Sequence, residues 1–86
     1  MTGRVDIYAK TITVVQSDTT TYGPTTSYGT WLRGLHVMAA GNVKILTHDG
    51  VTETWTCPAG FYIPRHIAKV FDTDTDVADA NLFSGE

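Results

Sequence analysis

The sequence predicts a small all-β protein: a single-domain antiparallel β-sandwich or barrel of about six or seven strands. Its 86 residues, 42% of them hydrophobic, are enough for one modest core. Threonine, valine, isoleucine and aromatic residues fill most of the chain between the turns, and these residues favour strands. Short apolar runs alternate with turn residues at close intervals, and no window carries the three- and four-residue spacing of an amphipathic helix.

The N-terminal part divides into an arm and the start of the domain. Residues 1–10 are predicted to form an extended arm or a first strand, with Val5 to Ala9 as its strand-like part, and residues 11–86 form the single β domain. In Thr11 to Gln16, Ile12 and Val14 fall on one side and the residues between them on the other, and this alternation predicts a strand. Residues 17–29 are rich in serine, threonine, glycine and proline, so we expect a long connection there.

A β-hairpin is the clearest local signal in the chain. Val43 to His48 and Val51 to Thr56 are strand-like and flank Asp49-Gly50, which is typical of a two-residue type I′ turn. Such a turn pairs His48 with Val51 and leaves polar and apolar residues mixed on both faces. Either threonine simply suits an exposed sheet, or the second face also meets a partner.

The remaining strands are expected on both sides of this hairpin. Thr30 to Val37 predicts a strand interrupted by a bulge at Gly34, because glycine inside a strand often marks one. After the hairpin, Pro64 restricts its segment to an edge or a crossing position. The predicted elements that follow it are a strand from Arg65 to Phe71, an acidic turn at residues 72–76 and a final strand from Val77 to Phe83.

Composition disfavours several classes of function. The net charge is −3, and the six basic residues are scattered and all precede residue 72, whereas nucleic-acid binders usually cluster them. No signal peptide or membrane-spanning run is recognisable, so no membrane contact is expected. Cys57 is the single cysteine, which excludes a disulfide within the chain and fits folding in a reducing cytoplasm.

Motifs for catalysis are missing from the sequence. There is no nucleophile elbow, phosphate-binding loop or dinucleotide fingerprint, so we expect no enzyme, no catalytic residue and no cofactor. His36, His48 and His66 match no usual metal-ligand spacing, and we expect no metal site from them. The alternating aspartates of residues 72–76 begin like a calcium loop but lack its central glycine, which leaves a plain acidic turn or a looser cation site.

Three aromatic residues lie in or beside the long connection: Tyr22, Tyr28 and Trp31. Tyrosine and tryptophan anchor many protein interfaces, and together with serine and threonine they also bind sugar rings. The third interpretation is that Trp31 belongs to the core and the tyrosines cap its edge.

A series of short segments stands in an order and spacing that characterise one family of virion proteins. The segments are Leu35 to Ile45, His48-Asp49-Gly50, Cys57 to Gly60, Ile63-Pro64 leading to Val70, and the earlier Ser17-Asp18-Thr19. In these segments, over about two-thirds of its length, the chain resembles the head spike base proteins of tailed bacteriophages and gene transfer agents. After Val70 it departs from the family, because an acidic turn stands where a neutral turn rich in threonine and glycine is expected.

The resemblance implies a non-enzymatic structural protein of the virion, made in the host cytoplasm. It implies a symmetric homo-oligomer on the capsid surface, bound to the major capsid protein as a spike base, decoration or cement protein, with a spike or fibre as a further partner. Our candidate partner-binding residues are Thr2 and Arg4 in the arm, and Tyr22, Tyr28 and Trp31. Two alternatives are a free carbohydrate- or receptor-binding β-module that uses the three aromatic residues, and a metal-dependent enzyme.

Overall fold

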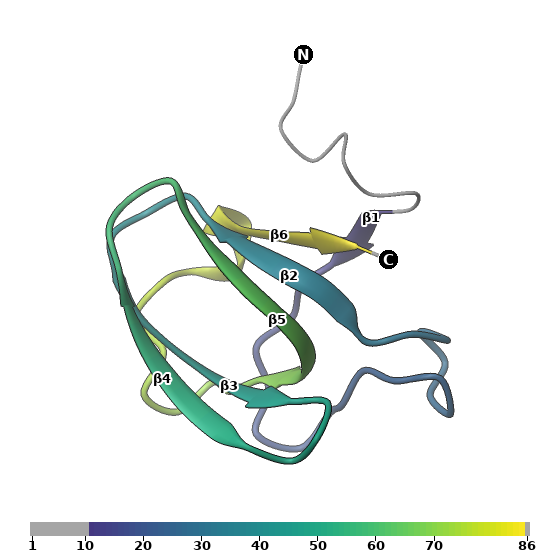
Figure 1. Cartoon of the computed structure of the whole chain (residues 1–86). Coiled ribbons are helices and arrows are strands. Elements are labelled where there is room, and N and C mark those ends of the chain that lie inside the picture. Colours follow the sequence, from purple (N-terminus) through teal and green to yellow (C-terminus); the bar gives the residue numbers. More distant parts are fainter. Residues whose placement is uncertain (1–10, 86) are drawn as a thin grey trace.

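A computed structural model describes residues 11–85, and these residues form an all-β domain (Figure 1). Six strands make one antiparallel sheet, with no α-helix in the described part of the chain. The strands are β1 (Thr11–Thr13), β2 (Leu32–Val37), β3 (Gly41–Thr47), β4 (Thr52–Cys57), β5 (Phe61–Val70) and β6 (Leu82–Gly85), and a short 3₁₀ turn spans Asp79–Asn81.

The order of the strands in the sheet is β1-β6-β2-β5-β3-β4. The last strand therefore lies between the first two, and β1 and β4 form the edges. Figure 1 shows the sheet bending strongly from the teal β3–β4 hairpin to the yellow β6 and purple β1. The prediction of an all-β domain with about six or seven strands is confirmed. Within residues 11–85 the six strands form one curved sheet in which β1 and β4 do not pair with each other.

The core consists of the apolar side chains that this curvature encloses. Leu32, Leu35, Ile45, Ile63 and Ile67 are completely buried and come from the three central strands. The rest of the buried apolar set is Ile12, Val14, Tyr22, Val37, Val43, Cys57, Val70, Val77 and Leu82.

The sequence predicted a bulge at Gly34, and the pairing of β2 with β5 is irregular at this residue. Arg33 pairs with His66 and Leu35 with Ile63, so the register against β5 shifts between them. Gly34 takes a φ of 77°, which L residues rarely adopt. Gly34 stands opposite two residues of β5, Pro64 and Arg65, and across this irregularity both Leu32 and Leu35 are buried.

The hairpin is located as predicted, but its predicted register is wrong by one residue. Ile45 pairs with Glu53 and Leu46 with Thr52, which leaves residues 48–50 as a three-residue loop. The Gly50 amide donates to the Thr47 carbonyl and Gly50 has a φ of 87°, the geometry of a three-residue hairpin loop with glycine in the left-handed position.

The correct register separates the two faces of the hairpin. Val43, Ile45 and Thr47 are buried on one face. On the other face, the threonines of β4 are exposed opposite half-buried residues of β3. The mixed faces inferred from the sequence followed from the wrong loop length, and in the isolated chain these threonines lie on an exposed sheet surface.

The bounds of several predicted strands differ in the structure, and one predicted strand lies outside the described residues. β2 begins at Leu32 rather than Thr30, and β5 spans Phe61–Val70 rather than residues 65–71. β1 ends at Thr13 rather than Gln16. Residues 77–81 are not a strand, and β6 begins only at Leu82, after the 3₁₀ turn. The arm of residues 1–10, with its candidate strand Val5 to Ala9, is outside the described part.

Pro64 lies inside β5, a single ten-residue strand. In its first half β5 pairs only with β2, and β3 joins its other side from Ile67 onward. β5 is an inner strand between β2 and β3, so the edge position expected for the segment after Pro64 is not found. Pro64, which has no amide hydrogen to donate, lies in the half of β5 that pairs on one side only.

The connection between β1 and β2 is long and irregular, as predicted. Its only strand-like feature among the described residues is an isolated bridge between Gly23 and Thr30. The Ser17 amide donates to the Val70 carbonyl and the Tyr22 amide to the Ala68 carbonyl, so the connection is fixed against β5. Within residues 11–85, no helix is long and apolar enough to cross a membrane.

Candidate partner-binding surface

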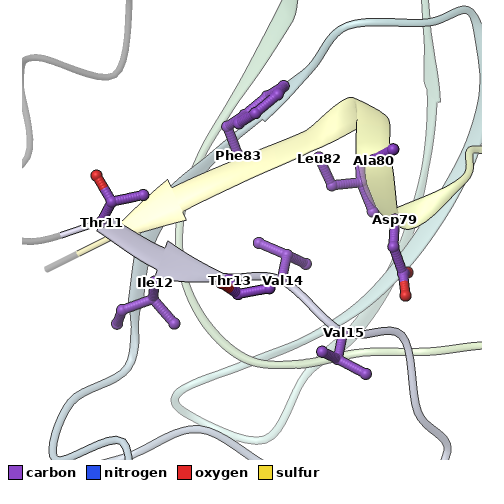
Figure 2. A pocket seen from close by; sticks show the side chains of 9 residues that line it. All are labelled: Thr11, Ile12, Thr13, Val14, Val15, Asp79, Ala80, Leu82 and Phe83. Carbon is purple, nitrogen blue, oxygen red and sulfur yellow. The ribbon is translucent and has the colours of Figure 1, made fainter.

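An apolar groove runs along the β1–β6 edge of the sheet (Figure 2). Its volume is about 360 Å³. Val15 and Phe83 are the exposed apolar residues of its lining, at 45% and 38% exposure, and Ile12 and Val14 form its buried part. The other lining residues are Thr11, Thr13, Asp79, Ala80 and Leu82.

Hydrogen bonds hold the chain in place beyond β1, where the groove continues. The Val15 amide donates to the Tyr22 hydroxyl over 2.9 Å, and the Gln16 amide donates to Asp79 Oδ1 over 3.1 Å. The Gln16 side-chain amide also donates to the Val77 carbonyl. These contacts join residues 15–16 to the segment before β6, so both walls of the groove are fixed to each other.

The groove lies beside a free strand edge. β1 pairs with β6 through three residues, from Thr11 opposite Gly85 to Thr13 opposite Phe83. The other side of β1 has no strand partner within residues 11–85. An edge strand with unpaired backbone groups beside apolar side chains can accept another extended chain by main-chain pairing and side-chain burial.

The groove was not among the sequence-based candidates. The signal for it was the break in alternation after Ile12 and Val14, where Val15 adds an apolar residue on the opposite side. Phe83 supplied the second signal, since it is a large apolar residue between the buried Leu82 and Ser84. Only the pairing of β1 with β6 brings these two signals together.

The structure corrects the role expected of Tyr22. Its side chain is only 2% exposed and belongs to the core, so in the isolated chain it offers no surface to a partner. The hydroxyl accepts from the Val15 amide, and burial raises its pKa. Tyr22 therefore anchors the connection to the sheet. In the interpretation that placed Trp31 in the core, the tyrosines lay at its edge, whereas in the structure Tyr22 is the core residue and Trp31 is only partly buried.

The other predicted contact residues lie apart from each other. Tyr28 is half-buried against Tyr22, with 4.4 Å between ring centroids. Trp31 is half-exposed and meets His48, with 5.3 Å between their centroids. Thr2 and Arg4 are outside the described residues. The three aromatic residues do not form one surface.

Trp31 instead belongs to an aromatic and basic cluster that joins β2, β5 and the hairpin loop. His48 and His66 lie with ring centroids 5.5 Å apart, and the His48 amide donates to the His66 carbonyl. Arg33 is exposed and pairs across the strands with His66. Sequence reasoning treated the histidines only as metal candidates and did not place them beside Trp31.

A second cluster lies where β4 approaches the first half of β5. The Arg65 guanidinium lies 5.2 Å from the Trp55 ring, and its Nε is 3.3 Å from Glu53 Oε1. The Trp55 indole nitrogen donates to the same Glu53 oxygen over 3.0 Å, and Phe61 lies 5.9 Å from the Trp55 ring. These contacts pair the charges of Glu53 and Arg65 with each other.

The histidines and the cysteine are the other residues for which the sequence raised a chemical role. No group of three or more histidine, cysteine, aspartate or glutamate side chains within residues 11–85 could hold a metal ion. The His36 ring contacts the Tyr62 ring in a tilted arrangement, with 4.7 Å between centroids, and burial lowers the pKa of His36. Cys57 is buried, and burial raises the pKa of its thiol, which disfavours the nucleophilic thiolate.

The acidic turn at residues 72–76 uses its polar groups internally. Asp18 accepts from the amides of Asp72 and Thr73, both at 3.0 Å, and from the Thr73 hydroxyl. Asp74 pairs with Lys44 at 3.4 Å. The bonds from the Thr73 hydroxyl and amide, and to a lesser extent the bond from the Asp72 amide, lower the pKa of Asp18, although desolvation acts in the opposite direction. The turn is thereby attached to the start of the long connection and to β3.

Comparison with known proteins gave no relative. No protein family, no curated protein and no solved structure matches this chain.

Proposed function

We propose that this protein is a non-enzymatic structural component of a tailed phage or phage-like particle, acting as a spike base, decoration or cement protein. It assembles with copies of itself and attaches to the major capsid protein. The family resemblance of the sequence motivates the capsid location, and the surface of the domain supports a role in protein assembly.

The observation that carries the proposal is the free β1 edge beside its apolar groove. Val15 and Phe83 leave apolar surface exposed along an edge with unpaired backbone groups. A lone soluble domain usually protects such an edge with charges, and Asp79 is the only charged residue in this lining. Burial against another subunit removes both the apolar surface and the open edge from water.

The occupant that we assign to this groove is a second copy of the chain. Within residues 11–85 the sheet has two different edges without a strand partner, the three-residue β1 and the six-residue β4. Pairing the β1 edge of one copy with the β4 edge of the next is a head-to-tail contact, and such contacts close into rings when the rotation between subunits permits. A ring covers every edge, in agreement with the symmetric oligomer that the resemblance implies.

The location is tested by quantitative mass spectrometry of intact particles produced from the same genome. A few copies per vertex relative to the major capsid protein are expected for a spike base, and near-equal copies for a decoration protein. Absence of the chain from purified particles would reject the virion location.

The groove is tested by placing a charge in it. Val15→Asp is expected to abolish self-association in sedimentation and to reduce incorporation into particles at least tenfold, because the carboxylate would be buried without a partner. Met38→Asp is the matched control, since Met38 is similarly exposed at 41% but lies in neither edge strand and does not line the groove. Equal loss in both variants, or no loss in Val15→Asp, would contradict the assignment of the groove.

A further inference from the structure

A hollow of about 220 Å³ lies beside the start of β2 and His66 of β5, and it shares no lining residue with the β1–β6 groove. Thr30, Trp31, Arg33 and His66 line it. Drug-sized ligands occupy pockets of roughly 300–1,000 Å³, so this hollow suits a ligand of about one ring.

The lining groups combine an aromatic surface with hydrogen-bond donors. The Trp31 indole provides an apolar face, against which the carbon-bound hydrogens of a sugar ring can pack. Arg33 carries a planar guanidinium that binds carboxylates through two parallel hydrogen bonds. The Thr30 hydroxyl donates to the Trp31 carbonyl at 3.1 Å and keeps its lone pairs for a ligand hydroxyl.

Arg33 is the distinctive residue of this hollow because its charge is not neutralised nearby. The ion pairs found within residues 11–85 are Lys44 with Asp74 and Arg65 with Glu53, and Arg33 takes part in neither. The lining contains no carboxylate, although the whole chain has a net charge of −3. The positive charge here is therefore a local feature that favours an anionic ligand.

A second hollow of about 310 Å³ shares His66 with the first and extends toward the hairpin loop. Its lining includes His48, Asp49, Glu53 and Arg65, which supply both donors and acceptors of hydrogen bonds. Such a mixed set matches the hydroxyl groups of a neutral sugar ring. Two adjacent hollows that meet at His66 form a short groove with one cationic and one mixed position.

We infer that this groove binds an acidic saccharide, with a uronic-acid carboxylate on Arg33, its ring against Trp31 and the following residue beside His48. This inference is independent of the proposed virion function, because it uses neither the β1 edge nor the groove beside it. It also differs from the sugar-binding alternative predicted from the sequence, since Tyr22 and Tyr28 have no part in it.

The test is a nuclear magnetic resonance titration of the full chain with glucuronic acid at constant ionic strength. A saturable shift of the signal of the Trp31 indole N–H group is expected, with a dissociation constant of about 1 mM for glucuronic acid. The signal of the Trp55 indole N–H group serves as internal reference. Glucose has the sugar ring without the carboxylate, and acetate has the carboxylate without the ring. Both are expected to bind at least tenfold more weakly than glucuronic acid.

Two variants separate the site from general charge effects. Arg33→Ala is expected to weaken glucuronic acid binding tenfold or more, because a bidentate charged contact is lost. Lys69→Ala removes the same charge outside both hollows and should leave binding unchanged. Equal affinity for acetate and glucuronic acid, equal weakening in both variants, or no saturable shift of Trp31 would each overturn the inference.

Discussion

Gly34 illustrates how one position can be restricted in two independent ways. Its φ of 77° is costly for any residue with a Cβ atom. A Cβ built there would also lie 2.1 Å from the Tyr62 hydroxyl oxygen and 2.5 Å from Cζ of the same ring. The backbone of the bulge and the tyrosine beside it thus both require glycine.

Gly34→Ala is expected to lower the free energy of unfolding by about 1–3 kcal/mol, since it adds backbone strain and displaces the Tyr62 ring. Urea unfolding followed by circular dichroism measures the change. Gly60→Ala is the matched control, because Gly60 has a φ of 83° with open space around its Cβ position. A loss no larger than that of Gly60→Ala would show that the Tyr62 contact carries no cost.

Asp18 is expected to make stability depend on acid pH. Its pKa is lowered from the usual 3.8 in the folded chain by the hydrogen bonds from Thr73 and Asp72. Its contribution is therefore present above about pH 4 and lost as the pH falls through the folded pKa. Asp18→Asn should flatten the dependence of the urea midpoint between about pH 5 and pH 2.

The control for this measurement is Asp72→Asn, which removes a carboxylate from the same turn but keeps the backbone amide that Asp18 accepts from. Asp49, whose pKa is lowered mainly by its bond from the Thr47 hydroxyl, retains its own acid dependence in both variants. An unchanged slope in Asp18→Asn would mean that the Asp18 bonds contribute nothing to folding.

At the residue scale, the sequence was a poor guide to which aromatic residues are buried. Tyr22 and Trp31 both stand among turn and strand residues, and the larger, more apolar indole was the natural choice for the core. The outcome depends on long-range contacts: the Tyr22 amide donates to the Ala68 carbonyl, which places its ring over the sheet. Its hydroxyl finds partners in the Val15 backbone, so burial leaves no polar group unsatisfied.

At the level of elements, the hairpin depends on Thr47, the last residue of β3. Its hydroxyl is buried and accepts from the Val51 amide at 3.1 Å. Its single proton is donated to Asp49 Oδ1, with the Val51 carbonyl at 3.1 Å as the other acceptor within reach. The Thr47 amide adds a bond to the same carbonyl at 2.8 Å. The side chain thus closes the three-residue loop together with the backbone.

Thr47→Val is expected to destabilise the fold by about 1–3 kcal/mol, because the new side chain has the same shape but leaves the Val51 amide without its side-chain partner. Thr52→Val is the control, since Thr52 is exposed on the outer face of β4 and should change stability by less than about 0.5 kcal/mol. Similar losses in the two variants, measured by thermal unfolding, would exclude this role for the Thr47 hydroxyl.

The elements show what local patterns can and cannot predict. The hairpin, the Gly34 bulge and the long connection follow from turn chemistry and were predicted correctly. The register of the hairpin was missed because Asp-Gly suits both a two-residue and a three-residue loop, and the choice depends on the Thr47 side chain. The predicted start of the final strand lies five residues before its observed start at Leu82. Residues 77–81 show the apolar–polar alternation of a strand, but they form a turn in which the Asp79 carboxylate accepts a hydrogen bond from the Gln16 amide.

For the whole molecule, the two free sheet edges lead to a prediction about concentration. If copies associate through the β1 edge, the midpoint of thermal unfolding should rise as protein concentration increases, because association stabilises the folded state. Val15→Asp should remove this dependence, whereas Met38→Asp, at an exposed apolar residue outside both edge strands, should keep it. A midpoint independent of concentration in the unmodified chain would contradict self-association.

The whole-molecule level also explains why the candidate surface escaped the sequence analysis. The groove joins Val15 to Phe83 across nearly the entire chain, and only the pairing of Thr13 with Phe83 brings them together. The same holds for the aromatic and basic cluster, in which His48 of the hairpin loop contacts both Trp31, just before β2, and His66 of β5. Single residues were noted, but their neighbours depend on a topology that local spacing does not encode.

Because β6 lies between β1 and β2, the sheet cannot be completed until late in the synthesis of the domain. β1 is made first, yet its strand partner β6 is made last, so β1 cannot join the sheet until residues 82–85 have left the ribosome. Until then, the groove beside β1 does not exist, and nascent chains cannot use it to recognise one another. The strand order thereby delays any assembly through this edge until β6 has been synthesised.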